Sequence, residues 1–169
     1  MPVISNVAFA ALASGALVAT VVDIRVRRIP NLLTAAMAGA GIGLAASGAS
    51  GVSLGGSIAG FILGLALMMP GYGLGATGAG DVKFMGAVGA IVGPALVVSA
   101  FLFTAVAGGV LALAVAIGRQ RLAVTIAGTG RLIAAPGDAK KEIRSASGSS
   151  RFAYGPAIAF GSVLAALIG

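Results

Sequence analysis

The sequence contains no cysteine, no histidine and no tryptophan, and only four of its 169 residues are acidic. Without cysteine and histidine, the chain cannot form disulfides, thiolate nucleophiles, zinc fingers or histidine-based catalytic sites. With so few candidate ligands we expect no catalytic metal and no cofactor. Charged residues are scarce too, at 9% of the chain, against roughly 25% in ordinary soluble domains.

Most of the chain is apolar instead: 59% of the residues are hydrophobic, and 28 residues are glycine. A core of this size cannot hide so much apolar surface from water, which predicts an integral membrane protein. A net charge of +7 would suggest nucleic-acid binding in a soluble protein. Here it fits an excess of Lys and Arg on cytoplasmic loops, so we expect membrane lipid and not nucleic acid as a partner.

The charged residues fall into three clusters, at 23–28, at 81–83 and at 119–151. The clusters are separated by 52 uncharged residues (29–80) and by 35 (84–118). Since one crossing takes about 17–25 residues, each gap suits two crossings that return to the same side. All three clusters therefore lie on one face, and their basic character predicts that it is cytoplasmic.

One further crossing before the first cluster and one after the third complete the count. The sequence predicts an all-α, polytopic membrane protein with about six transmembrane helices in the cell (inner) membrane and both termini outside the cytoplasm. We expect the chain (1–169) to form a single membrane-embedded domain with a basic cytoplasmic loop at about 119–151. The expected helices are 3–22, 31–48, 54–74, 82–92, 95–118 and 152–168, with Gly93-Pro94 dividing the fourth from the fifth.

Glycine is expected to serve two purposes. Gly56, Gly60 and Gly64 recur every four residues and line one helix face, which predicts close helix packing in lipid. The glycines between Gly71 and Gly80 have a spacing that suits no helix face. They predict a pliable, non-helical segment leading into Asp81.

Two of the four acids are candidates for chemistry. Asp138 and Glu142 lie among bases in a stretch that we interpret as a solvated amphipathic segment. Asp23 and Asp81 each lie at a junction with an apolar helix. By the predicted topology both are at cytoplasmic helix ends, where they would meet if the first and fourth helices pack together.

Two carboxyl groups that share a site do not ionise together. The ionised group would take a proton from water while the protonated one polarises a peptide carbonyl, as in aspartic proteases. The alternative is structural: each aspartate caps a helix or pairs with Arg25 or Lys83. Charges at the membrane interface are far cheaper than charges at the bilayer centre, so the residues alone leave both interpretations open.

Three segments resemble the motifs of one family. "DIRVRRIPN" (23–31) resembles the first-aspartate motif of prepilin peptidases, the type IV leader peptidase family of G-x-G-D membrane aspartic proteases. "GAGDVK" (78–83) resembles the second-aspartate motif, and "FAYGPAIAFG" (152–161) resembles the tyrosine-glycine-proline segment of the last helix. The three matches occur in the family's order and span most of the chain.

The resemblance implies an aspartic endopeptidase that cleaves the leader from type IV prepilins or pseudopilins on the cytoplasmic side, with Asp23 and Asp81 as the catalytic pair. Gly78 and Gly80 would shape the loop that presents the second aspartate.

Other motif residues would support the site. Lys83 would tune the aspartates or bind a lipid headgroup, and Pro30 would start the second helix. Asn31 would either hydrogen-bond near the site or simply belong to the helix terminus.

The chain also departs from the large bifunctional members, which carry an extra cytoplasmic domain and also methylate the new pilin N-terminus. Asn31 follows Asp23 by only eight positions, which leaves no room for the methylating part. The chain therefore resembles the short, peptidase-only CpaA/TadV-like branch associated with Flp/Tad pili. An archaeal-type preflagellin peptidase, a Ser-Lys hydrolase using Lys83, and a non-enzymatic transporter or structural subunit are the alternatives. The oligomeric state is not predicted.

Overall fold

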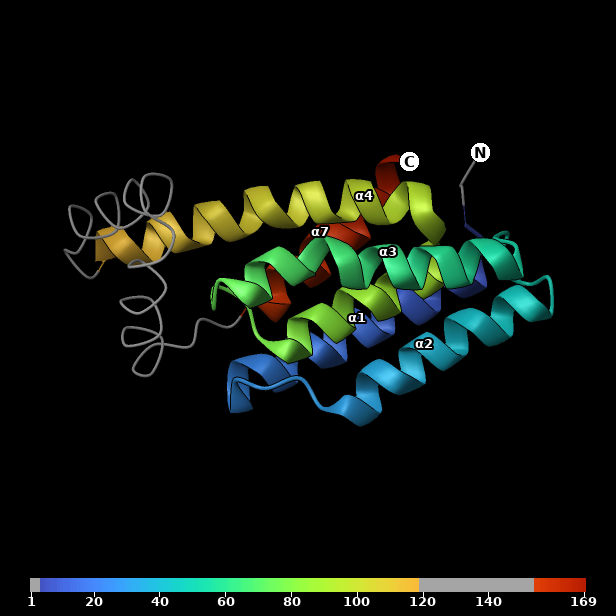
Figure 1. The fold of residues 1–169 in the computed structure, drawn as a ribbon, viewed down its shortest axis with the longest axis horizontal. Coiled ribbons are helices and arrows are strands. Elements are labelled where there is room, and N and C mark those ends of the chain that lie inside the picture. The colour runs from blue at the N-terminus through green and yellow to red at the C-terminus, as the bar shows by residue number, and fades with distance from the viewer. Residues whose placement is uncertain (1–3, 119–153) are drawn as a thin grey trace.

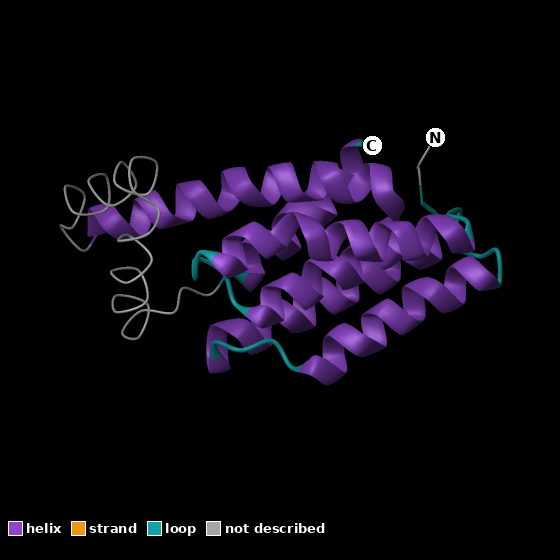
Figure 2. Cartoon of the chain, viewed as in Figure 1, coloured by secondary structure: helices purple, strands orange, loops and turns teal. Residues whose placement is uncertain are grey.

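The computed structural model describes residues 4–118 and 154–169, and within those ranges it contains helices, turns and no strand (Figures 1 and 2). This confirms the prediction of an all-α fold. The helices are α1 (Asn6–Val26), α2 (Asn31–Ala46), α3 (Leu54–Gly73), α4 (Ala79–Gly118) and α7 (Gly155–Ile168).

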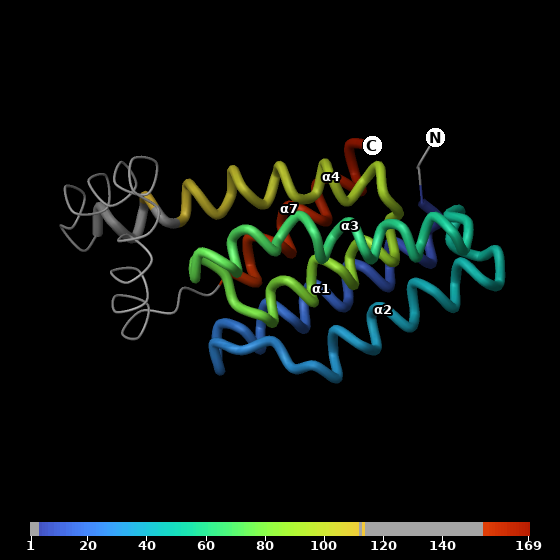
Figure 3. The backbone as a smooth tube through the Cα atoms, viewed as in Figure 1, coloured from blue at the N-terminus to red at the C-terminus, as the bar shows by residue number. Residues whose placement is uncertain are grey.

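Helix α4 is broken at the predicted position. Gly93 has φ 79° and ψ 178°, and Pro94 follows it. A positive φ favours glycine, and proline cannot donate the backbone hydrogen bond that would continue the helix. The backbone turns back at this point, so the part before Gly93 and the part after Pro94 run in roughly opposite directions (Figure 3). The first part begins at Ala79 and not at residue 82.

Three helical segments in the described residues are long and apolar enough to cross a membrane, namely Asn6–Val26, Leu54–Gly73 and Ala79–Leu111. Helices α2 and α7 are apolar but shorter. These helices support the assignment as a membrane protein. The count of six crossings stays a prediction, because it depends on how the shorter helices and the two parts of α4 sit in the bilayer.

The first part of α4 forms the centre of the bundle, with almost every residue from Val82 to Val92 buried. Helix α3 approaches it closely: a Cβ atom on Gly60 or Gly64 would meet the α4 backbone, in the case of Gly60 at the carbonyl oxygen of Gly89. The Ser57 hydroxyl also donates to the Ala90 carbonyl at 2.6 Å. The packing role predicted for Gly60 and Gly64 is therefore confirmed.

The predicted end of the first helix was wrong, and so was the prediction of a non-helical segment that begins at Gly71, whereas α3 ends within one residue of the expected 74. Helix α1 continues past residue 22 to Val26, because the cluster that was expected to end it places Arg25 in the last turn, where a positive charge is favourable. Helix α3 continues through Gly71 to Gly73, so the irregular segment is limited to residues 74–78. Each of these glycines costs the helix only about 1 kcal/mol, and the Leu74 N–H still bonds the Pro70 carbonyl.

Candidate active site

Three helix ends meet at one end of the bundle: the last turn of α1, the first turn of α4 and the first turn of α7 (Figure 1). The α1 and α4 ends carry Asp23 and Asp81, which are only 4% and 8% exposed. The two carboxyl groups are close enough to interact electrostatically. The structure thus brings the two aspartates of the predicted pair to the same buried end of the molecule.

Asp81 is held by the turn that precedes it. The Gly78 N–H donates a hydrogen bond to Asp81 Oδ2 at 2.8 Å. Asp81 is the third residue of α4, and an acidic side chain that reaches back from this position forms half of a capping box. A Cβ on Gly78 would lie 3.3 Å from Asp81 Oδ2, so the space there is tight. Capping is therefore part of what Asp81 does, and it also fixes the direction of the carboxyl group.

Asp23 has no comparable local reason for its position. It lies in the last turn of α1, where the helix dipole disfavours a negative charge. Its Oδ2 instead accepts a hydrogen bond at 2.8 Å from the N–H of Gly155, the first residue of α7. Within residues 4–118 and 154–169 neither aspartate forms an ion pair, so the alternative of pairing with Arg25 or Lys83 is not found.

The two motif segments contact each other beside the aspartates. The Lys83 ammonium donates to Asn31 Oδ1 at 2.9 Å in an exposed position. Pro30 was expected to be the first residue of the second helix. It is instead the N-cap residue, and α2 begins at the next residue, Asn31. A Cβ on Gly80 would lie 3.4 Å from the Cβ of Ile29, which is an ordinary contact. The first-aspartate loop and the start of α4 are therefore adjacent.

The resemblance of segment 152–161 to a family motif implied no role for Tyr154 or Gly155. The Tyr154 ring lies against α4, since a Cβ on Gly108 would come within 2.5 Å of the phenol oxygen. Burial raises the pKa of Tyr154, and the negative charge of Asp81 raises it further, so the phenol stays neutral at physiological pH. The match to the family's tyrosine-glycine-proline motif pointed to these residues. Their contact partners are distant in sequence, so the motif alone could not predict their roles.

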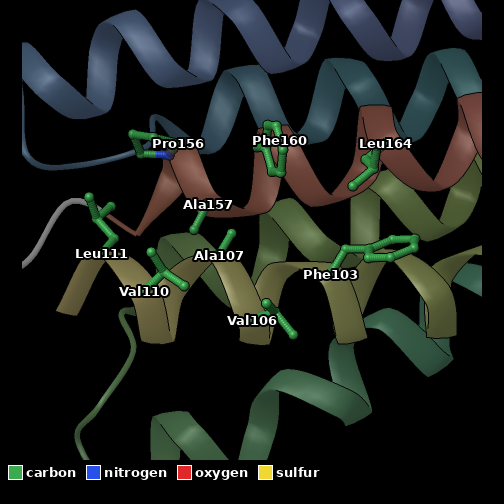
Figure 4. Close-up of a pocket in the computed structure, with 9 residues that line it drawn as sticks. All are labelled: Phe103, Val106, Ala107, Val110, Leu111, Pro156, Ala157, Phe160 and Leu164. Carbon is green, nitrogen blue, oxygen red and sulfur yellow. The ribbon is translucent and has the colours of Figure 1, made fainter. Parts of the chain in front are cut away.

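An apolar pocket of about 450 Å³ lies between the second part of α4 and α7 (Figure 4). Its lining residues share one property, which is that none carries a titratable side chain: Phe103, Val106, Ala107, Val110, Leu111, Pro156, Ala157, Phe160 and Leu164. The pocket can accept apolar groups but offers no acid, base or nucleophile.

The bond between Lys83 and Asn31 leads to a prediction. Because it is exposed, we expect Lys83→Met and Asn31→Ala to lower peptide cleavage by less than about tenfold, as exposed pairs contribute about 0.2–1 kcal/mol. Cleavage of a co-expressed substrate, read by gel shift, measures the effect. If Lys83→Met inactivated the protein as completely as Asp81→Asn, the Ser-Lys mechanism would replace the aspartate pair.

Comparison with known proteins adds independent evidence. A family model described as the type IV leader peptidase family matches residues 10–113. Searches of curated proteins and of solved structures gave no match. The family match covers more than half of the chain and includes both aspartates, Asn31 and Lys83, whereas α7 lies beyond it. This match, together with the fold of apolar helices, shows that the chain belongs to the type IV leader peptidase family.

Proposed function

We propose that this protein is a membrane aspartic endopeptidase that removes the leader peptide from type IV prepilins of the Flp/Tad type at the cytoplasmic face of the cell membrane. One observation carries the proposal. In a chain of this family, α1 and α4 bring two buried carboxyl groups, Asp23 and Asp81, to the same end of the helix bundle.

The arrangement supports a water-activating mechanism. With one carboxyl group ionised and the other protonated, the ionised group takes a proton from water as the water oxygen attacks the peptide carbonyl carbon. The protonated group donates a hydrogen bond to the carbonyl oxygen, where negative charge develops. When the tetrahedral intermediate collapses, the C–N bond breaks and the departing nitrogen takes the proton that the first carboxyl group removed from water. The first turns of α4 and α7 both point at this site, and helix N-termini favour the single negative charge that the pair must hold.

The position of the site suits a prepilin, whose basic leader precedes an apolar helix. The aspartates lie at the ends of apolar helices and not at their centres, so a bond at the boundary of the apolar segment would reach them. The basic segment 119–151, which lies outside the described residues, should not attract a basic leader. We propose that it binds anionic lipid headgroups.

The connection between α1 and α2 supports the assignment to the short, peptidase-only branch. Helix α1 ends at Val26 and α2 begins at Asn31, so only the four residues 27–30 join them. An additional cytoplasmic domain cannot be inserted in this connection. We therefore propose that the protein cleaves the leader without methylating the new N-terminus.

Co-expression with candidate substrates tests the proposed function. We expect an Flp/Tad-type prepilin to be shortened by its leader, seen as a gel shift, with the new N-terminus unmethylated by mass spectrometry. A preflagellin and a prepilin with an altered leader junction serve as comparisons. Cleavage of the preflagellin alone would reassign the substrate, and no cleavage of either by an accumulated protein would refute the peptidase function.

A further inference from the structure

The start of α7 is tied to the end of α1 by a contact that the established family match does not include. Gly155 and Asp23 are 132 positions apart, and the hydrogen bond from the Gly155 N–H to Asp23 Oδ2 is buried. The first N–H groups of a helix have no partner within that helix. The carboxyl group of Asp23 therefore meets a donor that the fold of α7 leaves available.

This contact also offsets an unfavourable local position. Asp23 lies near the C-terminus of its own helix, where the dipole repels a negative charge, but it faces the N-terminus of α7, where a negative charge is attracted. The side chain is thus stabilised across the interface between two helices and not within either.

The space around this contact excludes a side chain at residue 155. A Cβ on Gly155 would lie 2.7 Å from Asp23 Oδ2 and 3.0 Å from Asp23 Cβ. Real Cβ atoms essentially never approach so closely, so either Asp23 or the start of α7 would have to move. The neighbouring Tyr154 lies against the second part of α4 at Gly108, and the Gly155 N–H itself bonds Asp23. Movement at residue 155 would therefore change the position of one carboxyl group relative to the other.

We propose that the first turn of α7 is the positioning element of the peptidase site, in which the Gly155 N–H orients the Asp23 carboxyl group toward Asp81. The inference rests on the proposed function, because it assigns a role in the same reaction. Gly155 acts through Asp23 and does not touch the substrate. Residue 155 must accordingly be glycine for full activity, although the position is helical and not left-handed.

The contact itself can be tested without any activity. Tyr72-Gly73 and Tyr154-Gly155 are the two Tyr-Gly pairs of the sequence, so the full-length protein labelled with ¹³C-carbonyl tyrosine and ¹⁵N-glycine gives two selective amide signals. We expect Asp23→Ala to shift the Gly155 amide proton upfield, while the amide of Gly73, the last residue of α3, does not bond Asp23 and stays in place. An unmoved Gly155 signal would overturn the proposal whether or not the protein cleaves prepilin.

The kinetic consequence is tested by Gly155→Ala in the purified full-length protein, with a prepilin as substrate. We expect kcat to fall by about 10²-fold with little change in KM, because a misplacement of about 1 Å at reacting groups costs that much. Gly109→Ala is the matched control, since a Cβ at Gly109 meets nothing within 4 Å, and it should cleave like the wild type. A Gly155→Ala protein with wild-type kcat would contradict the positioning role. Failure of the wild type to cleave would instead refute the proposed function and leave the amide shift to decide the contact.

Discussion

Asp23→Asn and Asp81→Asn should each reduce prepilin cleavage by about 10²–10⁴-fold, the contribution typical of a general acid or base. Asparagine keeps the size of the side chain, and its amide oxygen can still accept the hydrogen bond from Gly155 or from Gly78. It cannot gain or lose a proton. Each variant should therefore insert and accumulate normally while cleavage of a co-expressed prepilin, measured by gel shift, is lost.

The double variant and two controls sharpen this result. Residues that act as a unit are non-additive, so Asp23→Asn combined with Asp81→Asn should be no worse than either single variant. Asp138→Asn and Glu142→Gln, which lie outside the described residues, should cleave almost normally. Cleavage near the wild-type rate in either single variant would refute the two-aspartate mechanism in favour of a Ser-Lys or non-enzymatic function.

The second large effect is expected on stability. A Cβ on Gly60 would meet the carbonyl oxygen of Gly89 across the contact between α3 and α4, so Gly60→Ala must push the two helices apart. Overpacking of this kind typically costs about 1–3 kcal/mol. We expect a lower thermal unfolding temperature in detergent and reduced accumulation of the protein in the membrane.

Gly55→Ala in the same helix is the matched control. A Cβ at Gly55 meets nothing within 4 Å, and alanine is the better helix former. Its unfolding temperature should equal or exceed that of the wild type. Equal stability of the Gly60 and Gly55 variants would show that α3 does not lie against the central helix as the structure describes.

The sequence motifs predicted the two aspartates of the site but not the hydrogen bonds that hold them. Asp23 and Asp81 could be singled out because charge is so rare in this chain and because each adjoins an apolar helix. Asp81 also carries a local pattern, since a glycine turn precedes it and a capping bond follows from that turn. Gly155 could not be found this way, because its bond to Asp23 joins residues 132 apart. No local pattern encodes which helix end will face a given carboxyl group.

Some helix boundaries were predictable from the local sequence and others were not. Gly93-Pro94 was predictable as a break because a positive φ and a missing N–H act on the backbone directly. Gly71 and Gly73 were expected to be irregular, yet α3 includes both. Glycine lowers helix stability by only about 1 kcal/mol, and the bond from the Leu74 N–H to the Pro70 carbonyl continues the helix through these positions.

The central claim is that both aspartates of one chain form the peptidase site. The most direct measurement is the rate of leader release from a reconstituted prepilin by liposomes that contain equal amounts of the Asp23→Asn and Asp81→Asn proteins, set against wild-type liposomes. Because α1 and α4 bring Asp23 and Asp81 to the same end of a single helix bundle, the account predicts rapid release by the wild type and none by the mixture. Recovery of release in the mixture would show that the pair forms between two copies of the chain and would contradict the account.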